Sequence, residues 1–297
     1  MPLSGFRAGT SIRVDWGMAS DSSFRLGFFI GLLIPLILWE LSAPRRSLTT
    51  PKSGRWFNNM GIVILNTAAL RAIFPVLAVD ISFTAQQNGW GLLNNYHMPY
   101  WIAVVIGVIS LDLVIYLQHV MFHTVPVLWR LHMVHHADLD IDVSTGLRFH
   151  PIEIALSMLV KMGAVAVIGH PAVSVIIFEV ALNATSMFNH GNIRMPAWLD
   201  GALRLIVVTP DMHRVHHSVA IRETNSNFGF NFPWWDRFFG TYRAQPAAGH
   251  TNMVIGLAQF RNPGRLSLPW LLVLPFVGDT GAYAINRRGR EPDVRNR

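Results

Sequence analysis

Apolar stretches of about 20 residues, the length that a helix needs to cross a bilayer, constrain this chain most strongly. Three stretches reach that length, at residues 24–43, 58–80 and 99–118, and Arg71 interrupts the second. A fourth covers residues 152–183 and has Gly169-His170-Pro171 near its middle. Because glycine and proline break helices, we interpret the fourth stretch as a helical hairpin, with one long tilted helix as the alternative.

The composition also indicates a membrane protein. Of the 297 residues, 51% are hydrophobic and 14% are charged, whereas soluble domains carry about 25% charged residues. We therefore predict an all-α integral membrane protein with about four membrane helices or hairpin segments and a cytoplasmic, histidine-rich helical cap. Residues 1–98 would form an N-terminal membrane region, residues 99–243 a central domain, and residues 244–297 an interfacial or cytoplasmic tail.

Positive charge predicts the orientation, because cytoplasmic loops are enriched in Lys and Arg. Residues 44–57 contain four basic residues and no acid, whereas residues 81–98 contain no Lys or Arg. The first loop is then cytoplasmic, the chain returns to that side near residue 118, and the hairpin leaves everything after residue 183 there. The C-terminal arginines agree (Arg287, Arg288, Arg290, Arg295 and Arg297), whereas Arg7, Arg13 and Arg25 leave the side of the N-terminus open.

Two further features of the composition narrow the function. The chain has no cysteine, which excludes disulfides, iron–sulfur clusters and thiolate ligands, so that any metal must bind nitrogen or oxygen. The net charge is +7, but no basic stripe interleaved with aromatic residues is present, and we predict no nucleic-acid partner. Residues 268–278 are too short to span a bilayer, and we expect them to pack at its interface or against the cap.

Histidine spacing is the most specific signal. Eight of the 13 histidines form one HxxxH and two HxxHH motifs, which are His119 and His123, His132, His135 and His136, and His213, His216 and His217. For randomly placed histidines an HxxHH pattern would occur about 0.02 times in a chain of this length, and two copies are present. Residues at i, i+3 and i+4 share one helix face, so each motif is expected to present its imidazoles together.

These motifs predict a metal centre. Pro126 should separate the first pair, at the end of a membrane helix, from a new helix that carries the first HxxHH. Imidazole suits zinc, copper, iron and nickel, and eight clustered imidazoles exceed what one ion can use, so two metals are the simplest interpretation. His190 is expected to join as a ligand, and His150 is a possible ligand or hydrogen-bond partner of one. His97, His170 and His250 are expected to be background.

The sequences around the motifs resemble the membrane fatty acid hydroxylase and sterol desaturase superfamily. The resemblance rests on the motifs and on DVSTGLRFHPIE at 142–153, FNHGN at 188–192 and HRVHHSVAIRETNSNFGFNFPWWDRFFGTY at 213–242, and it covers about residues 100–243. It identifies the predicted domain at 99–243 as a fatty acid hydroxylase-like catalytic domain. The chain departs from the family's usual Asn-Tyr-Gly at Phe228.

The resemblance implies a non-haem di-iron centre that uses O₂ to hydroxylate or desaturate a sterol, fatty acyl or ether lipid. The eight motif histidines and His190 would hold two iron ions, and a separate reductase, ferredoxin or cytochrome would supply electrons. Asp138, Asp140, Asp142, Asp211 and Asp236 are candidate acceptors for the ligand histidines, with a helix cap or a solvated loop charge as the equal alternative for each. The alternative is a membrane protein that binds or transports a divalent metal, although transporters place their ion sites near the bilayer midplane.

Some weaker signals lie outside the motifs. Trp234-Trp235-Asp236-Arg237 would line a lipid entrance or pack the cap onto the membrane, because tryptophan favours membrane interfaces. Glu153, Lys161 and Glu179 lie in or beside the hairpin, where a charged residue is either functional or snorkels to the surface.

Overall fold

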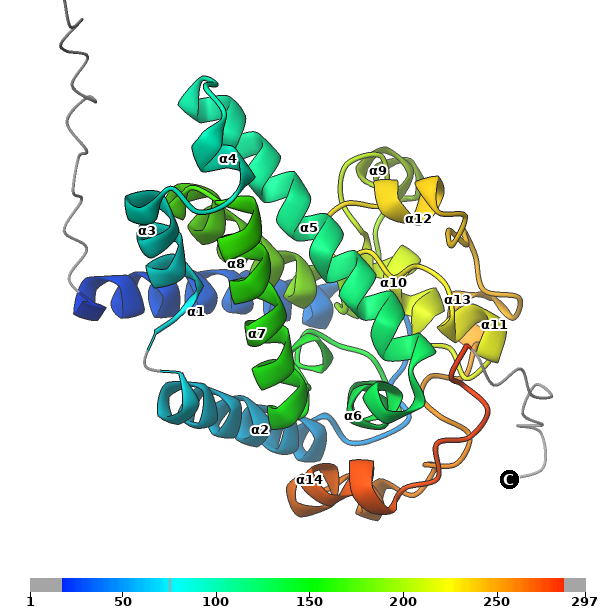
Figure 1. The fold of residues 1–297 in the computed structure, drawn as a ribbon. Helices are drawn as coiled ribbons and strands as arrows, with labels where there is room; N and C mark the ends of the chain where they lie inside the picture. Colours follow the sequence, from blue (N-terminus) through cyan, green and yellow to red (C-terminus); the bar gives the residue numbers. More distant parts are fainter. Residues whose placement is uncertain (1–17, 75, 286–297) are drawn as a thin grey trace, which may run out of the picture.

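The computed structural model describes residues 18–74 and 76–285, which form helices joined by loops (Figure 1). Within those residues no strand forms, and the extended pairing consists of two isolated bridges, Pro44 with Ile193 and Ser218 with Ile255. The predicted all-α class is confirmed. The arginines near both ends of the chain lie outside the described residues, except for the backbone at Arg25.

The third apolar stretch forms α5 (Tyr100–Thr124), which runs six residues past its predicted end and carries His119 and His123 in its last turns. Pro126 then starts α6 (Pro126–His136) at its first helical position, where the missing N–H costs nothing. The predicted break between the first histidine pair and the first HxxHH is therefore confirmed.

The fourth stretch is a hairpin, and the alternative of one long helix is wrong. It consists of α7 (Pro151–Ile168) and α8 (Ala172–Asn189), and Gly169 between them has φ of 76°. Glycine occupies this left-handed conformation without the Cβ clash of other residues. Pro171 follows at the N-cap of α8, so the chain cannot continue as a helix.

The first stretch forms a longer helix than predicted, and the second is divided between two helices. Residues 24–42 lie in α1 (Met18–Ser42), which starts six residues before the predicted stretch, and residues 58–80 fall in α2 (Lys52–Ile73) and α3 (Ala78–Asn88). Phe74 ends α2 in an extended conformation, as expected for a residue that precedes a proline. The predicted loop at 81–98 instead contains the end of α3 and α4 (Leu92–Asn95).

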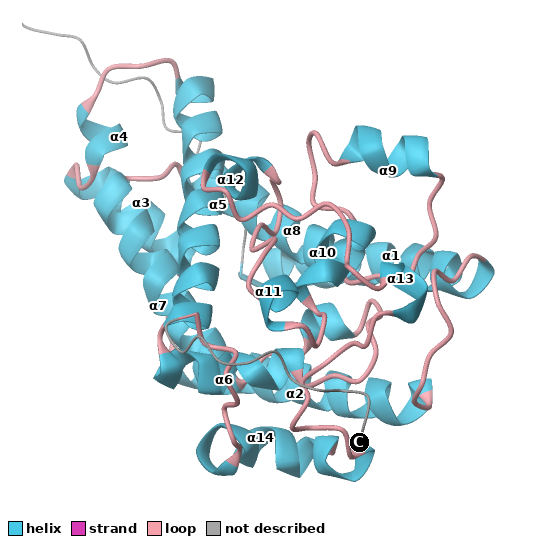
Figure 2. Cartoon of the chain, turned by 90° about the vertical axis from the view of Figure 1, so that its right-hand side faces the viewer, coloured by secondary structure: helices cyan, strands magenta, loops and turns pink. Residues whose placement is uncertain are grey.

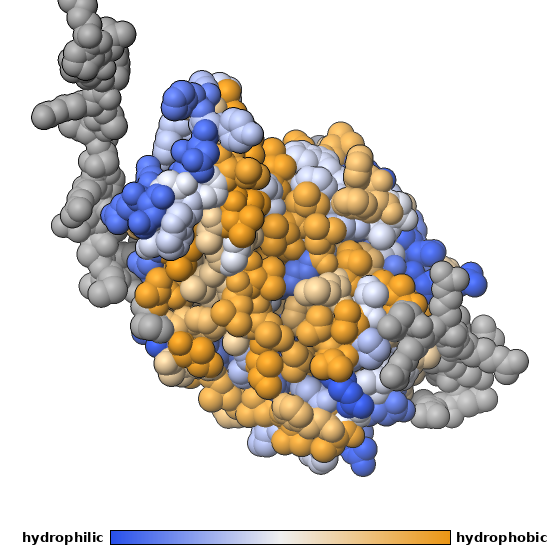
Figure 3. All heavy atoms as spheres, in the orientation of Figure 1, coloured by the Kyte–Doolittle hydropathy of each residue, from blue (hydrophilic) through white to orange (hydrophobic). Residues whose placement is uncertain are grey.

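Four segments are long and apolar enough to cross a membrane, namely residues 52–95, 100–124, 151–168 and 172–189. Leu26–Ser42 in α1 and α14 (Leu268–Val277) are shorter apolar helices. The expectation of about four membrane helices is confirmed, although α1 is not among them. In Figure 3 apolar side chains cover a wide area of the face formed by α5, α7 and α14.

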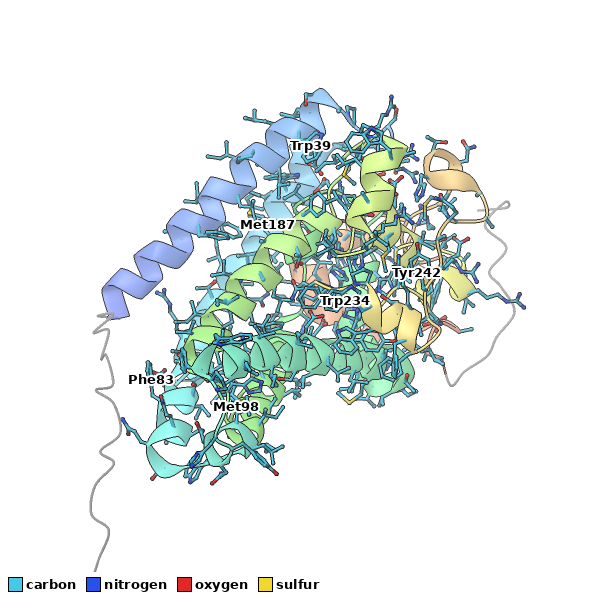
Figure 4. The ribbon with its side chains drawn as sticks, turned by 90° about the horizontal axis from the view of Figure 1, so that it is seen from above. Trp39, Phe83, Met98, Met187, Trp234 and Tyr242 are labelled. Carbon is cyan, nitrogen blue, oxygen red and sulfur yellow. The ribbon has the colours of Figure 1, made fainter. Side chains whose placement is uncertain are left out.

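The described residues form several apolar clusters. Helices α3, α5, α7 and α8 enclose one cluster that includes Leu111, Val165 and Phe178, and α1 packs along α8, where Trp39 and Met187 share another (Figure 4). The other helices are η1 (Thr145–Leu147), α9 (Ala197–Leu203), α10 (Pro210–His216), α11 (Ile221–Thr224), α12 (Trp234–Phe238), α13 (Gly249–Asn252) and η2 (Pro263–Leu266). Figure 2 shows α9 to α13 gathered beside the bundle.

The C-terminal segment packs against the cap. Trp129 of α6 donates to the carbonyl of Thr280 at 3.0 Å, and the Ile285 N–H donates to the carbonyl of His123 at 2.9 Å. Helix α14 lies against α6 and α2, which agrees with one of its two predicted positions. Contacts therefore cross the boundary predicted at residue 243, and the division into three parts stays a prediction.

The basic first loop lies beside the cap. Arg45 pairs with Asp211 at 3.1 Å, and Arg46 donates to the carbonyl of Met253 at 2.7 Å. These contacts place residues 44–57 on the same side of the bundle as the histidine motifs, which is the relation that the charge pattern predicted.

Candidate metal centre

Nine buried histidines converge where α5 and α8 end. They form one group of five (His119, His123, His132, His136 and His216) and one of four (His135, His190, His213 and His217), in each of which the candidate ligand atoms lie within 4.8 Å of one another. Each of the nine is at most 3% exposed. The structure thus brings together the eight motif histidines and His190.

Each HxxHH motif is divided between the two groups. His132 and His136 of α6 belong to the group of five and His135 to the group of four. In the second motif His213 and His217 belong to the group of four and His216 to the group of five. Each motif does present its three imidazoles together, with ring centroids 4.9 to 5.5 Å apart. The residue at i+3 nevertheless turns to the other group, while the i, i+4 pair stays in one group.

Short helices position the second motif and His190. Thr209 caps α10, its hydroxyl accepting from the Met212 N–H, and Pro210 fits the first helical position without the loss of a backbone hydrogen bond. His190 occupies the C-cap of α8, where its Nδ1 contacts the carbonyl of Ser186 at 2.7 Å. These local signals orient side chains that come from distant parts of the chain.

Backbone carbonyls hold four of the nine imidazoles through Nδ1, namely His190 and three others. His119 contacts the carbonyl of Phe228 at 2.7 Å, His135 that of Arg148 at 3.2 Å, and His216 that of Ser226 at 2.7 Å. A carbonyl oxygen only accepts, so Nδ1 carries the proton in these rings. Nε2 is then left with its lone pair directed into the group, as a metal ligand requires.

Close contacts between Nε2 atoms follow from this orientation. His135 Nε2 lies 3.0 Å from His190 Nε2, and the Nδ1 atoms of both rings donate to carbonyls. His119 Nε2 likewise lies 3.0 Å from His132 Nε2. Two unprotonated nitrogens at this distance repel each other, and a cation between them turns the repulsion into coordination. The donor set therefore fits a bound metal.

Burial keeps the cap histidines neutral. Loss of hydration lowers the pKa of His132 and of His190 to about 3, and in His190 the contact with Ser186 only partly offsets this effect. Burial and the neighbouring imidazoles also bring the pKa values of His135, His136, His213, His216 and His217 well below 6.5. Neutral imidazole is the protonation state that binds metals.

Two side chains that hold ligand histidines were not predicted to do so. His132 Nδ1 contacts Glu153 Oε1 at 2.6 Å, and His123 Nδ1 contacts Asn225 Oδ1 at 3.1 Å. The sequence singled out Glu153 only as a charge beside the hairpin. Its position three residues after His150, in the first turn of α7, was the available signal, but sequence spacing cannot show that this turn faces α6.

The five aspartates predicted as acceptors bind other groups. Asp138 and Asp142 pair with Arg55, Asp140 accepts from Thr49 and Thr50, and Asp211 pairs with Arg45 and Arg214. Asp236 accepts from the backbone N–H groups of Phe228 and Gly229 at 2.7 and 2.9 Å. These carboxylates therefore support the loops around the site, and this detail of the prediction was wrong.

Arg55 fixes α2 to the cap through a buried ion-pair network. Its guanidinium reaches both oxygens of Asp138, at 2.6 and 2.8 Å, and one oxygen of Asp142 at 2.6 Å. Burial disfavours the charged form of Asp138, but the charge of Arg55, together with that of Arg148, outweighs this effect and lowers its pKa. Arg148 in turn supplies the carbonyl that holds His135.

The other four histidines lie outside both groups. His150 caps α7 by accepting from the Ile152 N–H, and its Nε2 contacts the carbonyl of Leu272 at 3.2 Å. His170 contacts Ser110 at the opposite end of the hairpin, His250 contacts Gln245, and His97 is exposed. The division between motif and background histidines matches this placement.

Three phenylalanines pack against the groups. Phe228 makes edge contacts with His119, His123 and His216 at centroid distances of 5.1 to 5.5 Å. Phe149 stacks on His135 at 4.4 Å, and Phe230 contacts His119 at 5.0 Å. The departure at Phe228 therefore removes a hydroxyl from an apolar position, while the backbone carbonyl of this residue still holds His119.

The fold and the site define a membrane protein with two buried groups of histidines that could each hold a metal ion, and comparison with known proteins shows which family it resembles. Residues 104–241 match the family model of the fatty acid hydroxylases. The resemblance stated above is confirmed, and with it the class of a membrane oxidoreductase of the lipid hydroxylase type.

Several relatives are enzymes that act on lipids. The chain is 26% identical to the ornithine lipid hydroxylase OlsE of Rhizobium tropici over 241 residues, which are 76% of this chain and 69% of the relative. It is 27% identical to human alkylglycerol monooxygenase over 178 residues, 56% of this chain and 37% of the relative, and 31% identical to the Caenorhabditis elegans enzyme over 136 residues, 45% and 26%. The chain thus spans well under half of these monooxygenases. No solved structure matches it significantly.

Proposed function

We propose that this protein is a membrane-bound di-iron monooxygenase that hydroxylates a C–H bond of a lipid. The observation that carries the proposal is the pair of buried histidine groups, with facing Nε2 atoms 3.0 Å apart, at the ends of two apolar helices. The nine histidines would hold two iron ions, one in each group. Bound iron would activate O₂, and this chemistry belongs to the metal.

The residues of the chain would orient the ligands and exclude water. Carbonyls of Ser186, Ser226 and Phe228 hold imidazole rings through Nδ1. Phe149, Phe228 and Phe230 supply an apolar wall that suits a hydrocarbon chain. Hydroxylation places one atom of O₂ in the lipid and reduces the other to water with two electrons. We propose that a separate protein donates them, as a reductase, ferredoxin or cytochrome.

We also propose that the cap faces the cytoplasm of a bacterial inner membrane. The basic first loop contacts the cap, whereas residues 81–98 contain no Lys or Arg. This distribution favours the cytoplasm for the side on which the basic loop and the histidines lie together.

The test combines metal analysis with oxygen labelling. We expect wild-type protein purified from iron-supplied cells to contain about two irons per chain, one for each histidine group. His135→Ala should lose iron, whereas the matched His250→Ala change, outside both groups, should keep it. Lipids from cells that express the wild type under isotopically labelled O₂ should gain one labelled oxygen atom, and the His135→Ala cells should lack this product.

The same experiment separates the other candidates. Dehydrogenated lipid without labelled oxygen would indicate desaturation. Zinc in place of iron, with no lipid product, would support metal binding without turnover. A group of five donors exceeds the four of a closed structural zinc site, and this disfavours that reading. Iron content that does not change in His135→Ala would contradict the ligand set.

A further inference from the structure

An exposed apolar surface lies on the cap beside α5, apart from the histidine groups. We call it the α9–α12 surface, and it consists of six side chains that are 40 to 78% exposed: Trp198, Leu205, Ile206, Trp234, Phe238 and Phe239. Soluble surfaces rarely expose so many large apolar side chains together. A partner must therefore cover this surface.

Two contacts make the surface continuous with a membrane helix. Phe239 stacks on Tyr116 of α5 at a centroid distance of 5.4 Å, and Trp235 donates to Asp112 of α5 at 2.8 Å. On α5 itself, Leu117 is 49% exposed. Apolar surface thus continues from a helix long enough to span the bilayer onto the cap.

The position of the surface agrees with contact to lipid. Figures 1 and 2 place α12 beside the middle of α5 and α9 at the same level, short of the end of α5 that carries His119 and His123. Trp234 and Tyr242 are labelled there in Figure 4. At this level the α9–α12 surface is exposed to the same environment as the middle of α5.

The side chains are those that favour a membrane interface. Tryptophan is enriched where the hydrocarbon meets the headgroups, and the indole N–H of Trp234 is already satisfied by the carbonyl of Leu205 at 2.7 Å. Arg237 lies at the edge of the surface, where its guanidinium covers the ring of Tyr242 at 4.9 Å. Arginine at such an edge can reach lipid phosphates while its carbon chain covers apolar atoms.

We propose that the α9–α12 surface is inserted into the bilayer interface, so that the cap as well as the membrane helices contacts lipid directly. The occupant is the lipid of the membrane that contains the protein. This proposal does not depend on the reaction that the histidine groups support.

The absence of cysteine from the chain allows a direct test, because one introduced cysteine takes a single spin label. Labels at Phe238→Cys and Trp198→Cys would be compared, in vesicles of phosphatidylethanolamine and phosphatidylglycerol, with Leu159→Cys on α7 and Ala248→Cys at the start of α13. Leu159 and Ala248 are both exposed. The measurement is the collision rate of each label with O₂, which concentrates in lipid, and with a water-soluble nickel complex.

The expected result is that the labels at 198 and 238 resemble the one at 159, with an O₂-to-nickel ratio at least about fivefold above that at 248. A ratio equal to that at 248 would overturn the proposal, because the surface would then face water. Low collision rates with both reagents, together with spin–spin broadening, would also overturn it and identify a second copy of the chain as the occupant. Since all four sites are exposed, unchanged iron content and elution volume check the fold.

Discussion

Replacement of Glu153 by glutamine tests the asymmetry between the two histidine groups. Glu153 is 3% exposed, and its carboxylate lies 2.6 Å from Nδ1 of His132, in the group of five. For the other ligand histidines with a hydrogen-bonded Nδ1, the partner is a backbone carbonyl or an amide oxygen; these are His119, His123, His135, His190 and His216. The group of five is therefore the one that a carboxylate supports.

The magnitude follows from the charge that Glu153 carries when a metal ion is bound to His132, because a nearby cation favours the ionised carboxylate. A hydrogen bond to a charged group contributes about 1.5–3 kcal/mol and a neutral one about 0.5–1.5, so Glu153→Gln should lose on the order of 1 kcal/mol. This loss is about fivefold in metal affinity. Glu153→Ala leaves Nδ1 without an acceptor and should reach the upper end of the 10- to 100-fold range for residues that orient metal ligands.

The assay is competition for Fe²⁺ or Co²⁺ between the solubilised protein and a coloured chelator. Metal binding at the group of five should weaken and binding at the group of four should stay unchanged, so that the titration becomes biphasic. Glu223→Gln is the matched control, because Glu223 is also buried but accepts from the Ala247 N–H. Equal weakening of metal binding at both groups would refute the assignment of Glu153 to one group. Unchanged binding at both groups in Glu153→Ala would also refute it.

Three further predictions concern ligands, stability and pH. His216→Ala should remove iron and activity, whereas His250→Ala should leave both intact, as measured by metal analysis and lipid product. Arg55→Met leaves two buried carboxylates without their cation and should destabilise the fold by about 3–5 kcal/mol, seen as a lower melting temperature in detergent, whereas exposed Arg71→Ala should change it little. The folded-state pKa of His132 and of His190 is about 3, so the unfolded chain takes up protons first as the pH falls. Below pH 6.5 each of these two histidines should therefore lower the free energy of unfolding of the metal-free protein by up to about 1.4 kcal/mol per pH unit. A melting temperature that is independent of pH between 6.5 and 5 would contradict this last prediction.

Local chemistry made much of the fold predictable. Gly169 and Pro171 act within their own turn, and Pro126 starts α6 because it lacks an N–H. Arg71 was visible as an interruption of the second stretch, but the helix in fact ends at Ile73, before Pro75. A hydropathy window averages over such a break, so the separate helix α3 was missed.

The partners of the ligand histidines could not be predicted, because they depend on tertiary contacts. Twenty-one residues separate Glu153 from His132, and 109 separate the carbonyl of Phe228 from His119. The aspartates near the motifs were reasonable candidates from their spacing alone. They bind arginines instead, because Arg55 arrives from α2, a helix whose approach to the cap the sequence does not specify.

The contacts of residues 226–236 show why this part of the chain resembles the fatty acid hydroxylase family. Its carbonyls at Ser226 and Phe228 hold one imidazole each. Asp236 binds the N–H of Gly229, which lies in the same peptide group as the Phe228 carbonyl that faces His119. Trp235, one residue earlier, donates to Asp112 of the membrane helix α5. A displacement of α12 at the membrane surface would therefore move the acceptor of a metal ligand, so this segment must satisfy the bilayer and the metal centre together.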